Sequence, residues 1–504
     1  MTDQAHIVAW LRAGGPWGEA PDVVETHAAL VFLTGERAFK LKKAVNLGYL
    51  DFTTLDKRRH ALERELKLNR RTAHDMYRRV LPVTEAQGKF ALDGVGVPVD
   101  YVLEMKRFAK GALLSELADA GRLDVALVEK LAHQIANFHT TAETLAADWP
   151  SAVRRIADEN LKDLRARDVI DPIALERHEH VRAHALEHAK GALAHQSAAV
   201  RRCHGDLHLA NAFVDHGLPV LFDCIEFDDF YATIPPLYDL AFLLMDLCAR
   251  GLDAHANRAL NAWIMDHPPQ RWRALAEDLA ALPAYLALRA EIRAKTAAAK
   301  PGGSIDAHKY LALATRLAEG KQPTLVAVGG LSGTGKSTLA RALSPGLGRA
   351  PGAIHLRTDE IRKRLAGVSP DTRLSAVAYT AAKSAEVYGA MEGLARVCLA
   401  AGQSVIVDAV FARDHERDAV EAIAKAAHVP FHGFWLEAPA PTLEARLTGR
   451  VGDASDADVA VLHKQLAYDI GKLSWHRLDS APGVHAVAAT ARALMADDVW
   501  VVDI

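Results

Sequence analysis

Two short apolar segments near the N-terminus flank a polar tetrapeptide. Ala29 to Leu33 and Ala38 to Lys42 are separated by Thr34-Gly35-Glu36-Arg37. An apolar run, a turn sequence that contains glycine and a second apolar run are typical of a β-hairpin. We therefore predict two antiparallel strands at the start of the chain.

The hydrophobic periodicity then changes along the chain. Leu55 to Arg71 is charged with apolar residues at helical spacing, whereas Tyr101 to Met105 has the pattern of a buried strand. Long amphipathic segments predict helices as far as about residue 200. Strand-like segments return between Leu207 and Phe230, and helices are expected from Leu237 to Ala249 and onward to about residue 317.

A different pattern begins near residue 320. The polar segment Glu319 to Pro323 ends the helical region, and Thr324 opens an apolar run that leads into a glycine-rich turn and a helix. This order is that of the first βα step of a parallel sheet. We predict an α+β domain over residues 1–320 and an α/β domain with a parallel sheet over residues 321–504.

Composition supports a globular protein with more than one core. The 504 residues exceed the usual length of one domain, half of them are hydrophobic and 24% are charged. The formal net charge is −3. A chain without a basic excess has no field that would attract a polyanion, so we do not expect nucleic acid as a partner.

Cysteine usage and hydropathy indicate a cytoplasmic protein that does not enter a membrane. The four cysteines lie far apart without C-x-x-C spacing, so we expect them to be reduced. Ile7 to Leu11 is too short for the core of a signal peptide. The most apolar segment, Leu237 to Cys248, is interrupted by Asp239 and Asp246 and is too polar to span a bilayer.

A glycine-rich phosphate-binding motif lies in the C-terminal part. Gly330 to Ser337 fits G-x-x-x-x-G-K-[ST], with an apolar strand before it and a helix after it. In such a loop the backbone N–H groups converge on phosphate oxygens, the lysine meets the β/γ-phosphates and the hydroxyl faces Mg²⁺. The expected nucleotide-binding residues are Gly330, Gly333, Thr334, Gly335, Lys336, Ser337 and Thr338, with Ser337 also at the metal.

An aspartate and an arginine follow the next predicted strand, Ala353 to Leu356. Asp359 stands at its carboxyl end, where α/β sheets place ligands, and could accept a proton from a substrate hydroxyl. Arg362 lies on the same helical face and could contact the developing phosphoryl charge. The alternative is a helix-capping aspartate and a solvated arginine.

Three further residues could complete the site around the phosphate-binding motif. Ser404 to Asp408 is a strand that ends in an aspartate of the kind that supports Mg²⁺ in P-loop enzymes. Arg446 and Arg450 precede a polar loop and could act as a lid that presents cations to the phosphates. Two ordinary surface arginines are the alternative interpretation.

On these residues, about 323–478 resembles the P-loop small-molecule kinases, including the zeta-toxin, chloramphenicol phosphotransferase and polynucleotide 5′-hydroxyl kinase group. The resemblance implies that Asp359 is a general base, that Asp408 assists Mg²⁺ and that Arg446 and Arg450 embrace the phosphates. It does not imply a substrate, because these kinases accept very different hydroxyl compounds.

A second kinase pattern lies in the N-terminal part. His204-Gly-Asp206 is followed by Asn211, and Asp223 closes an apolar strand. At this spacing Asp206 would orient or receive the proton of the substrate hydroxyl, Asn211 would hold one Mg²⁺, and Asp223 would bridge metal and phosphates.

A lysine and a glutamate would complete that site. Lys40 ends Ala38-Phe39-Lys40 on the second hairpin strand, and Glu65 lies on the following helix. Their ion pair would direct the lysine to the α/β-phosphates. Lys42 lies on the same face of the strand and Glu63 is two residues from Glu65, so both assignments stay open.

On these motifs, residues 25–300 resemble the aminoglycoside phosphotransferase and choline kinase branch of the bilobal protein-kinase-like fold. The resemblance implies that Glu104 and Met105 form a hinge at adenine and that Asp239 supports the catalytic loop. The chain departs from protein kinases in two respects: no G-x-G-x-x-G loop is present, and Cys224-Ile225 replaces Phe-Gly after the metal aspartate.

One further pattern is weaker. His180, His184 and His188 recur along one helix face. Two of them could share a Zn²⁺, but no cysteine or acid completes the set, and a solvated stripe is the preferred interpretation.

The sequence thus predicts an ATP- and Mg²⁺-dependent phosphotransferase with two kinase sites that act on hydroxyl groups of small polar molecules. One alternative is a nucleotide-driven regulatory or toxin-like switch whose kinase-like half only binds. Another is a polynucleotide 5′-hydroxyl kinase, suggested by basic residues near the P-loop, and the overall charge argues against it.

Overall fold

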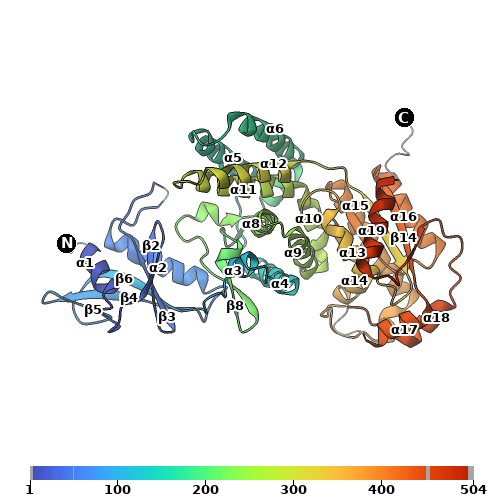
Figure 1. Cartoon of the computed structure of the whole chain (residues 1–504), viewed down its shortest axis with the longest axis horizontal. Helices are drawn as coiled ribbons and strands as arrows, with labels where there is room; N and C mark the ends of the chain where they lie inside the picture. Colours follow the sequence, from blue (N-terminus) through green and yellow to red (C-terminus); the bar gives the residue numbers. More distant parts are fainter. Residues whose placement is uncertain (1–3, 49, 450–453, 498–504) are drawn as a thin grey trace. The chain divides into compact units, whose positions relative to one another are not determined.

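The computed structural model describes residues 4–48, 50–449 and 454–497, and its chain divides into two compact units (Figure 1). The first unit comprises Met1–Ala147 and Ala198–Leu243, and the second comprises Asp148–Ser197 and Leu244–Ile504. The second unit therefore joins helices from the middle of the chain to the P-loop region. The predicted domain boundary at residues 320 and 321 stays a prediction.

An antiparallel six-stranded sheet opens the first unit, in the order β1-β2-β3-β6-β4-β5. Apolar side chains cover both of its faces. On one face α1 contributes Ile7 and Leu11 to a core with Phe32 and Phe39, and on the other α2 contributes Leu62. The bounds are α1 Gln4–Arg12, β1 Asp22–Glu25, β2 Ala29–Thr34, β3 Arg37–Lys42, α2 Leu55–Asn69, β4 Tyr77–Ala86, β5 Lys89–Leu92 and β6 Val97–Lys106.

The rest of the first unit is mostly loops and short strands that carry the catalytic-loop motif. Helix α4 packs against the β8–β9 hairpin. The elements are α3 Leu114–Asp119, α4 Val125–Thr141, β7 Arg201–Arg202, the 3-10 helix η1 Leu209–Asn211, β8 Ala212–Asp215, β9 Leu218–Leu221, η2 Asp229–Tyr231, β10 Thr233–Ile234 and the start of α8 Pro236–Ala249.

A helical layer forms one part of the second unit. Helices α11 and α12 pack against each other, and α5 and α6 pack against them through an apolar core that includes Leu164, Leu175, Ala294 and Leu311. The bounds are α5 Trp149–Arg165, α6 Pro172–His188, α7 Lys190–Gln196, α9 Asp253–Asp266, α10 Pro269–Asp278, η3 Leu279–Ala281, α11 Leu282–Ala298 and α12 Ser304–Ala318.

The other part of the second unit is a parallel five-stranded sheet in the order β12-β13-β11-β14-β15. Strands β11, β12 and β13 are wholly buried and β14 is nearly so, as expected when helices cover both faces, whereas only Leu478 is buried in the edge strand β15. The elements are β11 Leu325–Gly330, α13 Lys336–Leu343, η4 Ser344–Gly346, β12 Ile354–Arg357, α14 Thr358–Leu365, η5 Ala376–Tyr379, α15 Ala381–Ala400, β13 Val405–Asp408, α16 Asp414–Ala427, β14 Phe431–Glu437, α17 Ala440–Thr448, α18 Val459–Leu466, β15 His476–Asp479 and α19 Val484–Asp497.

Most predicted elements are confirmed. The hairpin forms as β2 and β3, and the predicted helix from Leu55 ends at Asn69. The segment Leu207 to Phe230 was expected to be rich in strands, but it holds only β8 and β9, because most of it is a loop that places polar groups. The patterns of β4 and β5 were missed.

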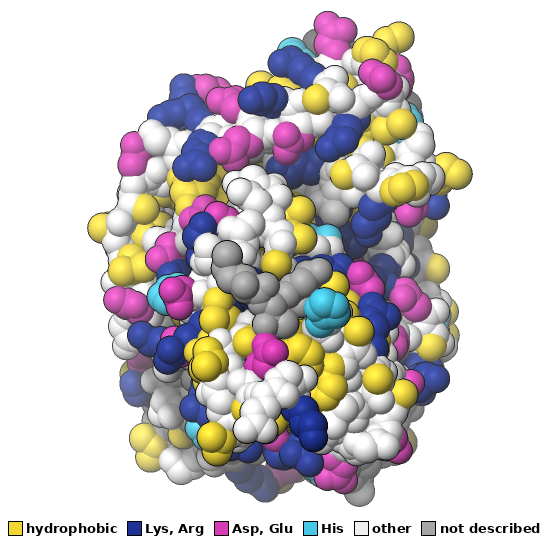
Figure 2. All heavy atoms as spheres, turned by 90° about the vertical axis from the view of Figure 1, so that its left-hand side faces the viewer, with side chains coloured by type: hydrophobic (Ala, Val, Ile, Leu, Met, Phe, Trp, Pro, Cys, Tyr) yellow, Lys and Arg dark blue, Asp and Glu magenta, His cyan; other side chains and the backbone are white. Residues whose placement is uncertain are grey.

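Three surface features bear on the other expectations. His180, His184 and His188 are all exposed on α6, as a solvated stripe requires. Among the described residues, no helix combines the length and apolar character needed to cross a bilayer. On the face drawn in Figure 2, basic and acidic side chains are interspersed and neither sign forms a continuous patch.

A buried carboxyl group on α10 makes the stability of the second unit depend on pH. Burial raises the pKa of Asp278 to about 6, against the opposing hydrogen bonds of Gln196 and His195. The folded chain therefore keeps this proton to a higher pH than the unfolded chain. Stability is lost as pH rises from about 4 to about 6 and stays lower above that window.

We expect Asp278→Asn to raise the free energy of unfolding at pH 7 by up to about 3 kcal/mol, because the amide needs no ionisation. At pH 4 the same substitution should have little effect. Urea unfolding at both pH values measures the difference, and equal effects at the two pH values would contradict the shifted titration.

Candidate functional sites

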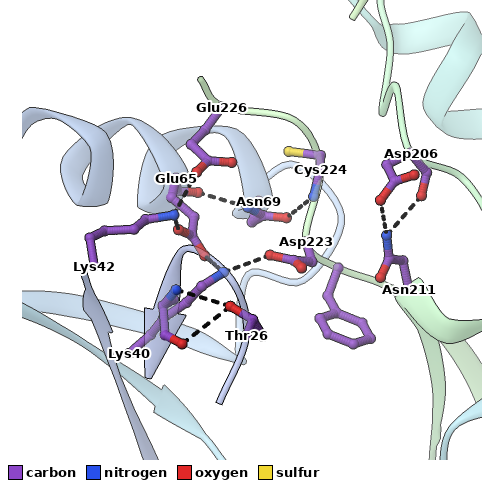
Figure 3. A network of polar contacts seen from close by, with 12 residues as sticks. Thr26, Lys40, Lys42, Glu65, Asn69, Asp206, Asn211, Asp223, Cys224 and Glu226 are labelled. Carbon is purple, nitrogen blue, oxygen red and sulfur yellow. Dashed lines mark hydrogen bonds and ion pairs between the residues drawn. The ribbon is translucent and has the colours of Figure 1, made fainter. Parts of the chain in front are cut away.

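A buried carboxylate and a strand lysine form the centre of the first site (Figure 3). Lys40 on β3 lies 2.7 Å from Glu65 Oε1 on α2 and 2.8 Å from Asp223 Oδ1. The Glu65 side chain is fully buried. The predicted pair of Lys40 and Glu65 is thus assembled, and the aspartate predicted to face the metal lies beside it.

The rival lysine has a different partner. Lys42 Nζ lies 2.7 Å from Glu65 Oε2 and 2.5 Å from Glu226 Oε1. Each oxygen of Glu65 therefore serves one lysine, whereas only Lys40 also reaches Asp223 in the described contacts. Glu63 is half exposed and pairs with Arg59 instead.

The charges of this cluster stabilise one another. Burial alone would lower the pKa of Lys40, but the carboxylates of Asp223, Glu65 and Glu226 hold that pKa well above its ordinary value. Burial would raise the pKa of Asp223, but the Lys40 ammonium outweighs it and the pKa of this carboxyl is lowered. At neutral pH both groups are charged, as phosphate and metal binding require.

Asp223 is held by its backbone as well as by Lys40. Its N–H donates to the Tyr77 hydroxyl at 3.2 Å, and the N–H of Cys224 donates to Asn69 Oδ1 at 2.9 Å. The φ angle of Asp223 is 59°, in the left-handed region that non-glycine residues seldom adopt. The loop is therefore shaped by its surroundings and not by local preference.

The catalytic-loop residues are brought together. Asn211 Nδ2 donates to the backbone oxygen of Asp206 and to its Oδ2, both at 2.9 Å. Asp206 also contributes to the electrostatic environment of Asp223, so the two acids share one site. Figure 3 shows Asp206 and Asn211 across from Asp223, on a separate segment of the chain.

Asp239 holds the backbone of the catalytic loop, as the resemblance implies. Its carboxylate is fully buried and accepts from the N–H groups of His204 at 3.0 Å and Gly205 at 2.8 Å. His139 Nε2 lies 3.0 Å from the same carboxylate. His204 Nε2 lies 2.9 Å from Phe222 O, which ties the loop to the residue before Asp223.

An apolar cluster adjoins the polar groups. Phe213 and Phe222, next to the predicted metal-facing residues, lie with ring centroids 5.6 Å apart, and Phe108 stacks on Phe213 at 4.8 Å. Glu104 and Met105 lie within β6, where β3 and β4 flank them on both sides. The strand thus continues past the expected hinge, and a contact of these two residues with adenine stays a prediction.

The phosphate loop of the second site has the expected form between β11 and α13. Gly330, Gly333 and Gly335 have φ angles of 134°, 84° and 88°. Any residue with a side chain would be strained at these angles. Lys336 Nζ donates to Leu331 O at 3.0 Å and so folds over its own loop. Thr334 is buried and donates to the same carbonyl, Ser337 is partly buried, and Thr338 is exposed on α13.

Asp408 lies beside this loop at the end of β13. It pairs in register with Val328 on one side and with Arg357 on the other. His355 Nε2 lies 3.2 Å from Asp408 Oδ2. Burial would raise the pKa of Asp408, but His355, Arg357 and Lys336 hold it well below its ordinary value.

The two predicted residues of α14 have different environments. Asp359 is about one-third exposed, and its carboxylate lies 3.9 Å from Arg357. Arg362 is buried and donates to Ala378 O at 2.6 Å, with its guanidinium over the Tyr379 ring. Arg362 thus holds the segment before α15, and its contact with a phosphoryl group stays a prediction.

Of the two arginines predicted to form a lid, Arg446 contacts the phosphate loop. Arg446 donates to Gly333 O at 3.4 Å and to Ser480 O at 2.7 Å, next to the phosphate loop. Arg450 lies outside the described residues. Asp456, in the polar loop that follows, accepts from the Tyr379 hydroxyl at 2.6 Å and the Leu374 N–H at 2.9 Å.

Sequence reasoning missed residues that act across the fold. They are Asn69, Tyr77 and Glu226 at the first site and His355, Arg357 and Gln465 at the second, where Gln465 accepts from the Ser332 N–H at 2.8 Å. A polar residue inside a strand, such as His355 in Ile354 to Leu356, is the one local signal that could have been used.

Mycobacterial proteins are similar to this chain over most of its length. The Mycobacterium tuberculosis protein named Uncharacterized protein Rv2004c is 30% identical over 484 residues, covering 91% of this chain and 92% of the relative. A Mycobacterium bovis protein, Uncharacterized protein Mb2027c, matches equally well. The chain belongs to the same family as these proteins.

Two family models match separate parts of this chain. Residues 90–297 match the Phosphotransferase enzyme family, and residues 325–468 match an AAA domain. The protein therefore joins an aminoglycoside phosphotransferase-like domain to a P-loop kinase domain, which confirms the resemblances and the predicted fold class. Both matches make it a phosphotransferase of kinase type.

Solved structures resemble each part of the chain. A choline/ethanolamine kinase family protein from Mesorhizobium loti is 14% identical, covers 62% of this chain and 99% of its own, and has a TM-score of 0.37. A gluconokinase from Sinorhizobium meliloti is 20% identical, covers 35% and 96%, and has a TM-score of 0.26.

We expect Asp239→Ala to destabilise the catalytic loop. The substitution removes the acceptor of two buried N–H groups and should cost about 3 to 5 kcal/mol in unfolding free energy. Hydrogen exchange of peptides that contain His204 and Gly205, together with urea unfolding, measures the effect. Asp75→Ala, whose side chain is 99% exposed, is the control, and equal effects of the two substitutions would contradict the supporting role.

Proposed function

We propose that this protein is an ATP- and Mg²⁺-dependent kinase with two active sites in one cytoplasmic chain, each acting on a hydroxyl group of a small polar molecule. The observation that carries the proposal is the convergence of Lys40, Glu65, Asp206, Asn211 and Asp223. These residues come from four segments that are far apart in sequence, and folding alone brings them to one place.

The oxygen donors of the first site suit magnesium. Asn211 uses its amide nitrogen for Asp206, which leaves its amide oxygen as the ligand atom. Asp223 Oδ1 contacts Lys40, and Asp223 Oδ2 is the oxygen that we assign to the metal. Hard carboxylate and amide oxygens are the ligands that Mg²⁺ prefers, and the ion would neutralise negative charge on the β/γ-phosphates.

The first site's own residues would then perform the transfer. Lys40, oriented by Glu65, binds the α/β-phosphates and aligns the nucleotide. Asp206 would accept the proton of the acceptor hydroxyl as the hydroxyl oxygen attacks the γ-phosphorus, while the bond from the γ-phosphorus to the β,γ-bridging oxygen breaks and ADP leaves. Asn211 would hold the Asp206 carboxylate in place during this step. The apolar rings of Phe213 and Phe222 exclude water from one side.

The second site would use the phosphate loop. Backbone N–H groups from residue 330 to residue 337 hold the phosphates, and Lys336 leaves Leu331 O to meet them. Ser337 and Asp408 would hold Mg²⁺, with Asp408 kept ionised by its contact with His355 and by the charges of Arg357 and Lys336. Asp359 is the general base, and Arg362, Arg446 and Arg450 contact phosphoryl charge in this proposal.

Nucleotide stoichiometry separates the two sites. Calorimetry with Mg²⁺ and a non-hydrolysable ATP analogue should find two sites per chain in the wild type. Lys336→Ala should leave only the first site and Lys40→Met only the second. At the substituted site the nucleotide affinity should fall by at least about a hundredfold, because a phosphate-binding cation is gone. Lys190→Ala, on a 71% exposed side chain, should leave both.

Transfer is tested on a panel of hydroxyl compounds with the same variants. Asp206→Ala should slow transfer at the first site by about 10² to 10⁴ and leave nucleotide binding near the wild-type level, because general-base catalysis is lost and phosphate contacts are not. Binding at both sites without phosphoryl transfer to any acceptor would favour a regulatory switch and overturn the kinase proposal.

Metal dependence distinguishes the two acids after β9. In a Lys336→Ala background, Asp223→Asn should raise the Mg²⁺ concentration needed for half-maximal activity at least about tenfold, because an anionic ligand becomes neutral. Glu226→Gln, three residues on, removes a carboxylate that faces Lys42 and should leave this Mg²⁺ requirement unchanged. A raised requirement in Glu226→Gln but not in Asp223→Asn would reverse the assignment.

A further inference from the structure

The edge strand β12 of the parallel sheet has a helix where a neighbouring strand could be. It pairs only with β13 in the described sheet, so the backbone groups on its other side face away from the ladder. Unpaired edges of this kind can pair with another chain unless something covers them. Helix α9, in the same compact unit, packs on this side of β12.

Two asparagines of α9 satisfy the exposed edge. Asn261 Oδ1 accepts from the His355 N–H at 2.7 Å, and its Nδ2 donates to Ala353 O at 3.2 Å. Asn257, one helical turn earlier, donates to Ala353 O at 3.0 Å. A side-chain amide carries one acceptor and a donor group, as a peptide unit does, so these side chains replace the hydrogen bonds of a missing strand.

Further contacts hold this region in place. Asp266, the last residue of α9, pairs with Arg364 of α14. Arg349 is buried and donates to Leu279 O at 2.8 Å and to Ala401 O at 2.6 Å. Figure 1 shows α9 and α10 next to α13, α14 and α15, and the contacts of α10 with α15 agree with that view.

The edge matters because of what β12 carries. Its residue His355 contacts Asp408 through the side chain, while its backbone N–H donates to Asn261. Arg357 lies 3.9 Å from the same carboxylate, and Thr358 donates to Asp408 O at 3.2 Å. Asp359 follows directly. A shift of β12 would therefore move several groups around the phosphate loop together.

We propose that α9 is a structural component of the P-loop kinase site, with Asn261 as a positioning residue that acts through His355 on Asp408. This assignment crosses the boundary between the sequence families, because α9 lies in the segment that matches the Phosphotransferase enzyme family and β12 lies in the AAA match. The catalytic part of the inference rests on the proposed function, whereas the edge cover does not.

Hydrogen exchange of the full-length chain tests the edge cover directly. Asn261→Ala removes the acceptor of the His355 N–H, so peptides that contain His355 should exchange about tenfold faster. Asn257→Ala removes a donor to Ala353 O and an acceptor of the Asn261 amide, but it keeps the Asn261 Oδ1 that accepts from His355. It should therefore change the exchange of the His355 N–H much less than Asn261→Ala does. Asn137→Ala, an exposed asparagine on α4, is the control for the substitution itself.

The positioning role has its own measurement. In an Asp206→Ala background that leaves the second site, Asn261→Ala should lower kcat about tenfold and raise the Mg²⁺ requirement, with KM for the nucleotide within about twofold, because the phosphate loop itself is untouched. A loss of nucleotide binding in proportion to kcat would mean general unfolding and overturn the positioning role.

The two failures can be told apart. Unchanged exchange at His355 in Asn261→Ala overturns the edge cover, whether or not the protein transfers phosphate. Faster exchange in a protein whose wild type transfers no phosphate supports the edge cover and overturns the proposed kinase function alone.

Discussion

One buried carboxylate holds the first site together. The Glu65 side chain has no exposed surface, and each of its oxygens contacts a lysine from the same strand. A single buried anion would be strongly destabilising, and so would either buried lysine alone. Because the charges compensate one another, β3, helix α2 and the loop of Asp223 and Glu226 must come together for any of them to be stable.

The same principle governs the P-loop site with a different set of groups. Asp408 is buried at the end of β13 and is balanced by His355, Arg357 and Lys336, which come from two other segments. In both sites the aspartate proposed to face the metal is kept ionised before any ligand arrives, by Lys40 in the first site and by the His355 hydrogen bond with Arg357 and Lys336 in the second. The site geometry is therefore set by the folded chain itself, as preorganisation requires.

The two matched regions of this chain are also joined by hydrogen bonds. Its P-loop sheet has an edge whose backbone groups are met by asparagine side chains of α9, a helix that the family models assign to the other domain. The fusion is thus built into the hydrogen bonding of the second compact unit and is not limited to a linker.

Local chemistry was enough to determine several parts of this protein from sequence. The glycine loop with Lys336 and the Asp206–Asn211 pair depend on residues close in the chain, so their spacing predicts their geometry. The hairpin of β2 and β3 follows from two short apolar runs on either side of a turn sequence. Glu63 and Glu65 lie nearly on opposite sides of a helix, yet only the folded structure showed which side is buried.

Tertiary structure decided the rest, because the partners are distant in sequence. Lys40 and Lys42 share one face of a strand, and only the position of Asp223, 183 residues from Lys40, separates their roles. Glu226 at Lys42, His355 at Asp408 and Asn261 at β12 are pairings of the same kind. A sequence pattern records which residues can be charged or buried, whereas the choice among possible partners is made by packing, which brings one pair into contact and removes water from around it.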